Sequence, residues 1–232
     1  MEGRGLGGAL SAGSLPPAPS ELAGGTGILG GTFDPVHYGH LAVAEDVRET
    51  LGLERVLFVP AGMPPHKPDR LITPPAHRVA MVELAIAGNP AFALSRVEVD
   101  RTGPSYAADT VELLIAEATA EGRSSAFVFI MSAEAFTLLH TWHEPERLLR
   151  ACRLAVVPRP GHRTPGRPWV AEHFPGLEDR VLFLVGPDLG HSASAIRARV
   201  AAGRSIRYLV PPAVAAYIAG HDLYPPELWR KN

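Results

Sequence analysis

The stretch that decides the fold of this chain is Gly30-Gly31-Thr32-Phe33-Asp34-Pro35-Val36-His37-Tyr38-Gly39-His40. It follows a short apolar run and precedes a segment with helical periodicity, so it marks a change from strand to helix. The two glycines at its start permit a tight turn and leave main-chain N–H groups uncovered. The helix that follows directs its N-terminal N–H groups and its positive dipole end toward that turn. The stretch therefore predicts a loop that binds a polyphosphate.

Two histidines support the same interpretation. His37 and His40 lie three residues apart and should project from roughly one face of the first helical turn. The pair could instead bind a metal ion or only cap the helix, although no third metal ligand is evident nearby in the sequence. Phosphate binding is the interpretation that we favour.

Composition limits the classes of protein that fit. The 232 residues, 46% of them hydrophobic, suffice for one substantial α/β core. The formal charge of −2 gives no general attraction to nucleic acid, and no apolar run reaches the roughly 20 residues of a membrane span. The single cysteine, Cys152, excludes an intramolecular disulfide and fits a cytoplasmic protein with a buried thiol. We therefore expect a cytoplasmic protein without nucleic-acid or membrane partners.

Apolar runs and helical patterns alternate along the chain, which predicts a Rossmann-like, doubly wound and mostly parallel α/β sheet. The most apolar run, 126–131, should lie centrally in that sheet. In such folds, ligands bind at the carboxyl ends of the strands. Strands are expected at 28–31, 55–60, 92–95, 96–102, 126–131, 154–157 and 181–185. Helices are expected at 41–51, 75–87, 105–120, 145–150, 192–202 and 212–219, with loops at 61–75 and 158–168.

Three regions follow from this pattern. Residues 1–25 are rich in Gly, Ala, Ser and Pro and lack periodicity, which predicts a disordered extension. Residues 26–190 should form the α/β core. Residues 191–232 should form a C-terminal helical segment.

Five short motifs carry a family resemblance when they are taken in order. The motifs are Gly30 through His40, Pro64-Pro65-His66-Lys67, Pro104-Ser105-Tyr106, Thr141-Trp142 and Ser192-Ala193-Ser194-Ala195-Ile196-Arg197. In this order they resemble the nucleotidylyltransferases of the HxGH type, and more closely the bacterial nicotinate-nucleotide adenylyltransferases, from about residue 27 to residue 224. That family transfers AMP from ATP to nicotinate mononucleotide, which gives deamido-NAD and pyrophosphate in NAD biosynthesis.

The resemblance implies an ATP site to which the C-terminal segment contributes. His37, His40 and Arg197 would be catalytic, because the attacking phosphate is already ionised and only alignment and charge neutralisation are needed. Mg2+ would be carried mainly by the ATP phosphates, so no protein metal site is expected. The implied ATP-binding residues are Gly30, Gly31, Thr32, Phe33, His37, Gly39, His40, Ser132, Glu134, Ser192, Ser194, Ile196 and Arg197.

The resemblance also implies a site for the mononucleotide. The indole of Trp142 could stack on an electron-poor pyridine ring, although Trp142 could also be a core residue. The pair His66-Lys67 could equally form an ordinary solvated loop, and Tyr106 could serve packing alone. The implied residues are Asp34, His66, Lys67, Ser105, Tyr106, Thr141 and Trp142.

One departure from the family pattern leaves other functions open. Ser132-Ala133-Glu134 stands where Gly-x-Asp is common, and that acid usually contacts the ribose of ATP. One alternative is a related transferase whose acceptor is nicotinamide mononucleotide, phosphopantetheine or, with CTP, a sugar-alcohol phosphate. The other is a catalytically weakened nucleotide-binding protein. The Thr141-Trp142 pair and the proline-rich loop favour a pyridine mononucleotide as the acceptor. The expected partners are therefore ATP and nicotinate mononucleotide.

Overall fold

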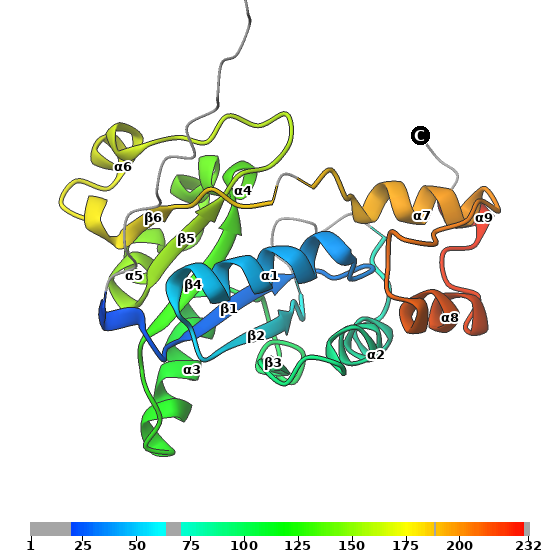
Figure 1. Ribbon diagram of the computed structural model, residues 1–232, viewed down its shortest axis with the longest axis horizontal. Helices are drawn as coiled ribbons and strands as arrows, with labels where there is room; N and C mark the ends of the chain where they lie inside the picture. Colours follow the sequence, from blue (N-terminus) through cyan, green and yellow to red (C-terminus); the bar gives the residue numbers. More distant parts are fainter. Residues whose placement is uncertain (1–19, 64–70, 188, 230–232) are drawn as a thin grey trace, which may run out of the picture.

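The computed structural model describes residues 20–63, 71–187 and 189–229, which form one six-stranded sheet with helices on both faces (Figure 1). All five neighbouring strand pairs run parallel. The spatial order is β3-β2-β1-β4-β5-β6. The strands are β1 (Thr26–Gly31), β2 (Arg55–Pro60), β3 (Phe92–Leu94), β4 (Phe127–Ser132), β5 (Arg153–Val157) and β6 (Val181–Phe183).

The topological switch of the sheet lies between β1 and β4, because β2 and β3 follow one another to one side of this pair and β5 and β6 to the other. These two strands pair at the centre, with Leu29 opposite Ile130, while β2 and β3 lie on the far side of β1. The central position expected for the run 126–131 is therefore confirmed, as is the doubly wound fold class. The loops after β1 and β4 leave the sheet at this topological switch, where such folds bind ligands.

Both faces of the sheet are covered, because alternate strand residues enter two separate cores. Leu29 and Ile130 pack into the cluster beneath α1 and α2, whereas Ile28 and Phe129 pack into the cluster beneath α3, α5 and α6. Burial on both faces explains why the strands read as continuous apolar runs. The helices are α1 (Tyr38–Leu51), α2 (Pro75–Ile86), α3 (Ala107–Ala120), α4 (Ala133–Thr137), α5 (Pro145–Ala151), α6 (Arg167–His173), α7 (Ala193–Ala201), α8 (Pro212–Gly220) and α9 (Pro226–Trp229), with short turns η1 (Ser20–Leu22), η2 (Leu139–Thr141) and η3 (Glu178–Arg180).

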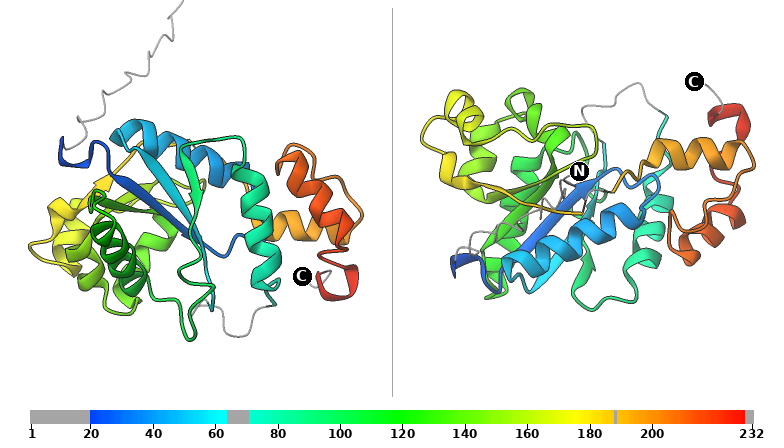
Figure 2. Two further views of the ribbon diagram at one scale, coloured as in Figure 1. Left: turned by 90° about the horizontal axis from the view of Figure 1, so that it is seen from below. Right: turned by 45° about the horizontal axis from the view of Figure 1, so that its top comes forward.

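The last three helices gather beside α2 at one end of the molecule (Figure 2). The chain reaches them after β6 through a long connection that passes back across the sheet (Figure 1). Val214 and Ile218 of α8 join the same core as α1 and α2. This route brings residues near 192–197 to the loop that follows β1. No helix in the described part of the chain is long and apolar enough to cross a membrane.

Three expectations were wrong in part. Residues 96–102 form a turn rather than a strand, because the Asp100 N–H donates to the Arg96 carbonyl and their side chains pair at 2.7 Å. Helix α6 begins at Arg167, inside the segment 158–168 that was expected to be a loop. The extension expected over 1–25 also reaches too far, because η1 is ordered and Leu22 is only 3% exposed in the core. Residues 1–19 lie outside the described residues.

The lone cysteine is a core residue, as its apolar context predicts. The Cys152 side chain is 2% exposed, and its thiol donates to the Leu148 carbonyl at 3.6 Å. Burial raises the pKa of this thiol to about 12, so it stays protonated and unreactive near neutral pH.

Candidate active site at the carboxyl ends of the strands

His37 and His40 lie together at the start of α1. His37 is the residue just before the helix and His40 is in its first turn, and their rings stack with centroids 3.7 Å apart. The His37 N–H donates to His40 Nδ1 at 3.2 Å. Because Nδ1 accepts this bond, a neutral His40 carries its proton on Nε2. Nδ1 of His40 thus caps the helix, and the donor of this ring is the separate Nε2–H group.

Both imidazoles are neutral near pH 7 in this structure. The pKa of His37 is lowered to about 4, chiefly by burial and also by the nearby positive charges of His191 and Arg159. The pKa of His40 also lies well below its usual range, first because of burial and then because of His37. Each ring can therefore donate one N–H to a phosphate oxygen without an ion pair. The surrounding positive charge adds a favourable electrostatic potential for polyphosphate.

The loop between β1 and α1 is shaped by close packing. Phe33 adopts a positive φ of 50° and is 2% exposed, with its ring 5.0 Å from that of His40. A Cβ on Gly31 would lie 3.2 Å from the Phe33 ring, and one on Gly39 would lie 3.0 Å from His191 Cβ. Glycine at position 39 thus lets the first turn of α1 approach the segment before α7.

Helix α7 brings the C-terminal residues of the predicted ATP site to this loop. Ser192 precedes the helix, and its hydroxyl accepts from the Ala195 N–H at 3.5 Å. The Arg197 guanidinium donates from Nη1 to the Asp34 carbonyl at 2.6 Å and from Nη2 to the Ser194 hydroxyl at 3.1 Å. Ile196 is 1% exposed in the core, so any contact that it makes with a nucleotide would come from its main chain.

Asp34 has a structural role that the sequence did not indicate. Its carboxylate is 3% exposed and accepts from the Thr73 N–H at 3.2 Å and from the Tyr224 hydroxyl at 2.9 Å. The side chain therefore ties the loop after β1 to the start of α2 and to the C-terminal segment. Its direct contact with a mononucleotide stays a prediction.

Ser132 and Glu134 follow β4, on the other side of the topological switch. The Ser132 hydroxyl accepts from the Ala135 N–H at 3.2 Å and caps α4. Glu134 pairs with Arg159 at 3.0 Å, and Nε2 of His162 lies 3.9 Å from the same carboxylate oxygen. The longer acid is thus held by the loop after β5, which sequence analysis had not connected with the site.

Some of the residues that were predicted to bind the mononucleotide lie near one another in the structure. Ser105 accepts from the N–H groups of Gly62 and Met63 at 3.1 and 3.2 Å, so its hydroxyl orders the loop after β2. The Tyr106 ring packs 4.1 Å from His143, which directly follows Trp142 in the chain. The half-buried indole of Trp142 also meets Phe129 edge-to-face, so it has a packing role. Thr141 is exposed, whereas His66 and Lys67 lie outside the described residues.

Four further side chains at this site were missed from the sequence: Arg78, Arg159, His191 and Tyr224. His191 stands directly before Ser192, and its ring lies 5.9 Å from that of His37, so its position beside a recognised motif was the available signal. The other three show no local pattern, because long-range contacts place them at the site.

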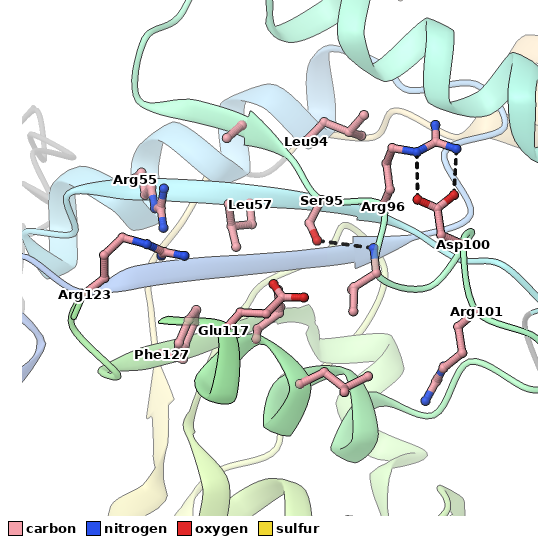
Figure 3. A pocket seen from close by; sticks show the side chains of 14 residues that line it. Arg55, Leu57, Leu94, Ser95, Arg96, Asp100, Arg101, Glu117, Arg123 and Phe127 are labelled. Atoms are coloured by element: carbon pink, nitrogen blue, oxygen red, sulfur yellow. Dashed lines mark hydrogen bonds and ion pairs between the residues drawn. The ribbon is translucent and has the colours of Figure 1, made fainter. Parts of the chain in front are cut away.

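A cavity of about 780 Å³ lies elsewhere, between the β2–β3 edge and α3 (Figure 3). Its arginines are largely matched by acids: Arg96 pairs with Asp100, and Arg101 pairs with Asp109. The lining residues include none of the histidines, serines or glycines of the site described above. The chemistry is therefore assigned to the loops at the strand ends rather than to this cavity.

A doubly wound parallel sheet with paired imidazoles and a helix N-terminus at its topological switch defines a nucleotide-binding α/β protein. A family model described as cytidylyltransferase-like matches residues 28–199. A probable nicotinate-nucleotide adenylyltransferase of Roseiflexus sp. (strain RS-1) is 48% identical over 198 residues, covering 85% of this chain and 96% of the relative. Another, from Thermomicrobium roseum, is 50% identical and covers 85% of this chain and 90% of the relative.

Solved structures show the same fold. Two structures of Plasmodium falciparum nicotinic acid mononucleotide adenylyltransferase, one complexed with APC and one with NaAD, match with TM-scores of 0.65 and 0.67. They are 19% and 20% identical, and each match covers 86% of this chain and 96% of the other. The chain belongs to the cytidylyltransferase-like family and, within it, to the nicotinate-nucleotide adenylyltransferases.

Proposed function

We propose that this chain transfers AMP from ATP to the 5′-phosphate of nicotinate mononucleotide and so serves NAD biosynthesis. The observation that carries the proposal is the meeting of His37, His40 and Arg197 around one loop at the topological switch. The relatives of similar length, which are named for this activity, support the same choice of reaction.

The chemistry demands little covalent help from the protein. An ionised phosphate oxygen of the mononucleotide attacks the α-phosphorus of ATP, and the bond from that phosphorus to the β-phosphate oxygen breaks to release pyrophosphate. No general base is needed, because the nucleophile carries its negative charge at neutral pH. Catalysis therefore rests on alignment and on donors directed at the developing charge.

The described side chains can supply those donors. His40 Nε2–H and the His37 ring lie at the N-terminus of α1, while Ser192 and Arg197 approach from α7. We assign the ATP phosphates to the space between these two helices, with Arg197 nearest to the departing pyrophosphate. Glu134 would face the nucleotide ribose, and Tyr106 and Trp142 would face the pyridine of the acceptor.

Magnesium is part of the proposal as a companion of ATP. In the part of the chain that the structure describes, no group of three or more His, Cys, Asp or Glu side chains is arranged to hold a metal ion. We propose that the ion is bound chiefly by phosphate oxygens and water, which is the coordination that Mg2+ prefers with nucleotides. When bound, it would neutralise phosphate charge together with Arg197, while the neutral imidazoles would donate N–H groups to phosphate oxygens.

One assay tests the reaction and the acceptor together. Purified protein is supplied with ATP, Mg2+ and either nicotinate mononucleotide, nicotinamide mononucleotide or phosphopantetheine, and pyrophosphate release is followed. We expect the highest kcat/KM with nicotinate mononucleotide. Turnover with phosphopantetheine alone would reassign the acceptor. Nucleotide binding without turnover of any acceptor would instead identify a protein that has lost the reaction.

A further inference from the structure

Arg78 of α2 is a buried cation that the reaction scheme above does not use. Its side chain is 1% exposed, in contrast to the usual surface position of arginine. Within residues 20–63, 71–187 and 189–229, its guanidinium hydrogen bonds all reach main-chain carbonyl oxygens. These belong to Thr32 at 2.8 Å, Thr73 at 2.9 Å and Gly62 at 3.5 Å.

Each of these carbonyls belongs to a different part of the active site. Thr32 lies in the loop after β1, two residues from the Asp34 carbonyl that binds Arg197. Thr73 precedes α2, and its N–H donates to the Asp34 carboxylate. Gly62 follows β2, and its N–H donates to Ser105 beside Tyr106. One side chain thus links the nucleotide loop to the segment predicted to bind the acceptor.

The contact with Gly62 is the longest of the three, but Gly62 is also fixed from its other side. A Cβ at this position would lie 2.3 Å from the Glu98 carbonyl oxygen, so the main chain there is closely packed. The Ser105 hydroxyl accepts from both Gly62 and Met63. Gly62 therefore lies between Arg78 on one side and the Glu98–Ser105 region on the other.

Arginine is suited to this position in a way that lysine is not. A planar guanidinium holds its donors on three nitrogens in a fixed fork, and here each nitrogen serves a different carbonyl. A lysine side chain has one nitrogen and cannot occupy those three positions together. Burial lowers the pKa of Arg78, and the nearby Asp34, Tyr224 and Glu98 oppose that shift. The side chain remains protonated, because an arginine is not deprotonated in proteins near neutral pH.

We propose that Arg78 is a positioning residue that holds the loop after β1 and the loop after β2 at a fixed spacing, so that acceptor phosphate and ATP meet in line. The inference rests on the proposed adenylyl transfer. The proposed function assigns ATP and the mononucleotide to different residues, so loss of the spacing should leave each binding step nearly intact. The transfer step should suffer, because misplacement by about 1 Å can cost on the order of 10²-fold in rate.

The test compares Arg78→Lys with the wild-type chain. We expect kcat to fall at least tenfold, while the dissociation constants of a non-hydrolysable ATP analogue and of nicotinate mononucleotide, each measured alone by calorimetry, change less than about threefold. Arg55→Lys is the matched control, because the hydrogen bond of the Arg55 guanidinium among the described residues goes to the Thr26 hydroxyl, at 3.5 Å, away from the site. That variant should keep its kcat.

The outcomes separate this inference from the proposed function. An inactive wild-type chain would refute the adenylyl transfer itself. An active wild type with an equally active Arg78→Lys would overturn only the role of Arg78, as would a loss of kcat that matches the unfolded fraction seen in thermal melting. If Arg78→Lys does not fold, Gly62→Ala replaces it, since the added Cβ would displace the Gly62 carbonyl. A folded Gly62→Ala with unchanged kcat would then refute the proposal.

Discussion

The Arg197 guanidinium donates a 2.6 Å hydrogen bond to the main-chain carbonyl of Asp34, across 163 residues of sequence. Its guanidinium carbon also lies 4.4 Å from the centroid of the Trp229 ring. The C-terminal segment is thereby fastened to the loop that follows β1. This contact places α7 beside the loop proposed to bind the nucleotide, and it gives the Arg197 guanidinium a fixed direction.

Replacing Arg197 should therefore slow catalysis more than it weakens the fold. We expect Arg197→Met to lower kcat on the order of 10²-fold, because it removes the charged donor that the proposed mechanism assigns to the departing pyrophosphate. Steady-state pyrophosphate release measures the effect. Arg199→Met, on the same helix, is the control, since Arg199 donates to the Ser205 carbonyl instead. Equal losses in both variants would assign the effect to α7 stability rather than to the guanidinium.

His40 should be the more important imidazole donor, because its Nδ1 is already occupied by the His37 N–H. His40→Ala is expected to lower kcat on the order of 10²-fold or more. His40→Gln should retain part of the activity, since an amide N–H can replace Nε2–H. The stacked but distant His221 provides the control variant His221→Ala, for which kcat should change less than about twofold. An unchanged rate in His40→Ala would remove this residue from the mechanism.

The depressed pKa of His37 predicts a loss of stability in acid. The folded-state pKa is about 4 against 6.5 for the unperturbed group, so the unfolded chain binds the extra proton between these values. The contribution of neutral His37 to the free energy of unfolding is fully present above pH 6.5 and is lost as the pH drops toward 4. At pH 5 this contribution has decreased by about 2 kcal/mol.

Urea unfolding at pH 7.5 and pH 5 measures the total loss, to which His40 also contributes because its pKa is lowered too, and the difference between wild type and His37→Gln gives the part due to His37. His37→Gln should reduce the pH dependence of the unfolding free energy, because the substituted side chain does not titrate. The partly buried His173, whose Nδ1 contacts the Trp169 carbonyl, provides the comparison variant His173→Gln. The same pH dependence in wild type and His37→Gln would mean that His37 is not buried in its neutral form.

Strong local patterns predicted the framework of the site. Helix α1 ends at Gly52, whose φ of 64° and N–H bonds to Arg48 and Glu49 carbonyls form the expected C-cap. The apolar run in β4 was sufficient to place that strand centrally, because only a strand covered on both faces is so uniformly apolar. The spacing of His37 and His40 likewise predicted that their side chains lie together, and their rings do stack; their binding of phosphate stays a prediction.

Contacts that depend on distant residues could not be read in the same way. Val97 and Val99 alternate with charges as in a strand, yet the segment turns and buries Glu98, which accepts from the Thr110 hydroxyl at 2.7 Å. Arg78 is buried because three carbonyls from separate loops surround it, and no local period encodes that arrangement. Asp34 was interpreted as a ligand residue, but its bonds to Thr73 and Tyr224 appear only once the chain has folded.

Glu134 provides the sharpest test of how this chain differs from the family pattern. Its carboxylate reaches Arg159 at 3.0 Å, and aspartate, one methylene shorter, would not span the same gap. We expect Glu134→Asp to fold with a stability change below about 1 kcal/mol, because the ion pair is substantially exposed. The KM for ATP should stay the same or fall, since the freed acid resembles the family residue that contacts the ribose.

The matched variant for this comparison is Arg159→Met, which frees Glu134 without shortening it. If the Glu134 carboxylate needs only to be freed from Arg159 in order to contact the ribose, Glu134→Asp and Arg159→Met should show similar KM values for ATP in pyrophosphate-release kinetics. The positive charge of Arg159 also lowers the pKa of His37 and His40, so Arg159→Met should raise both pKa values, and NMR titration can follow this. A severe rise in the KM for ATP confined to Glu134→Asp would instead mean that the ribose pocket is built around glutamate.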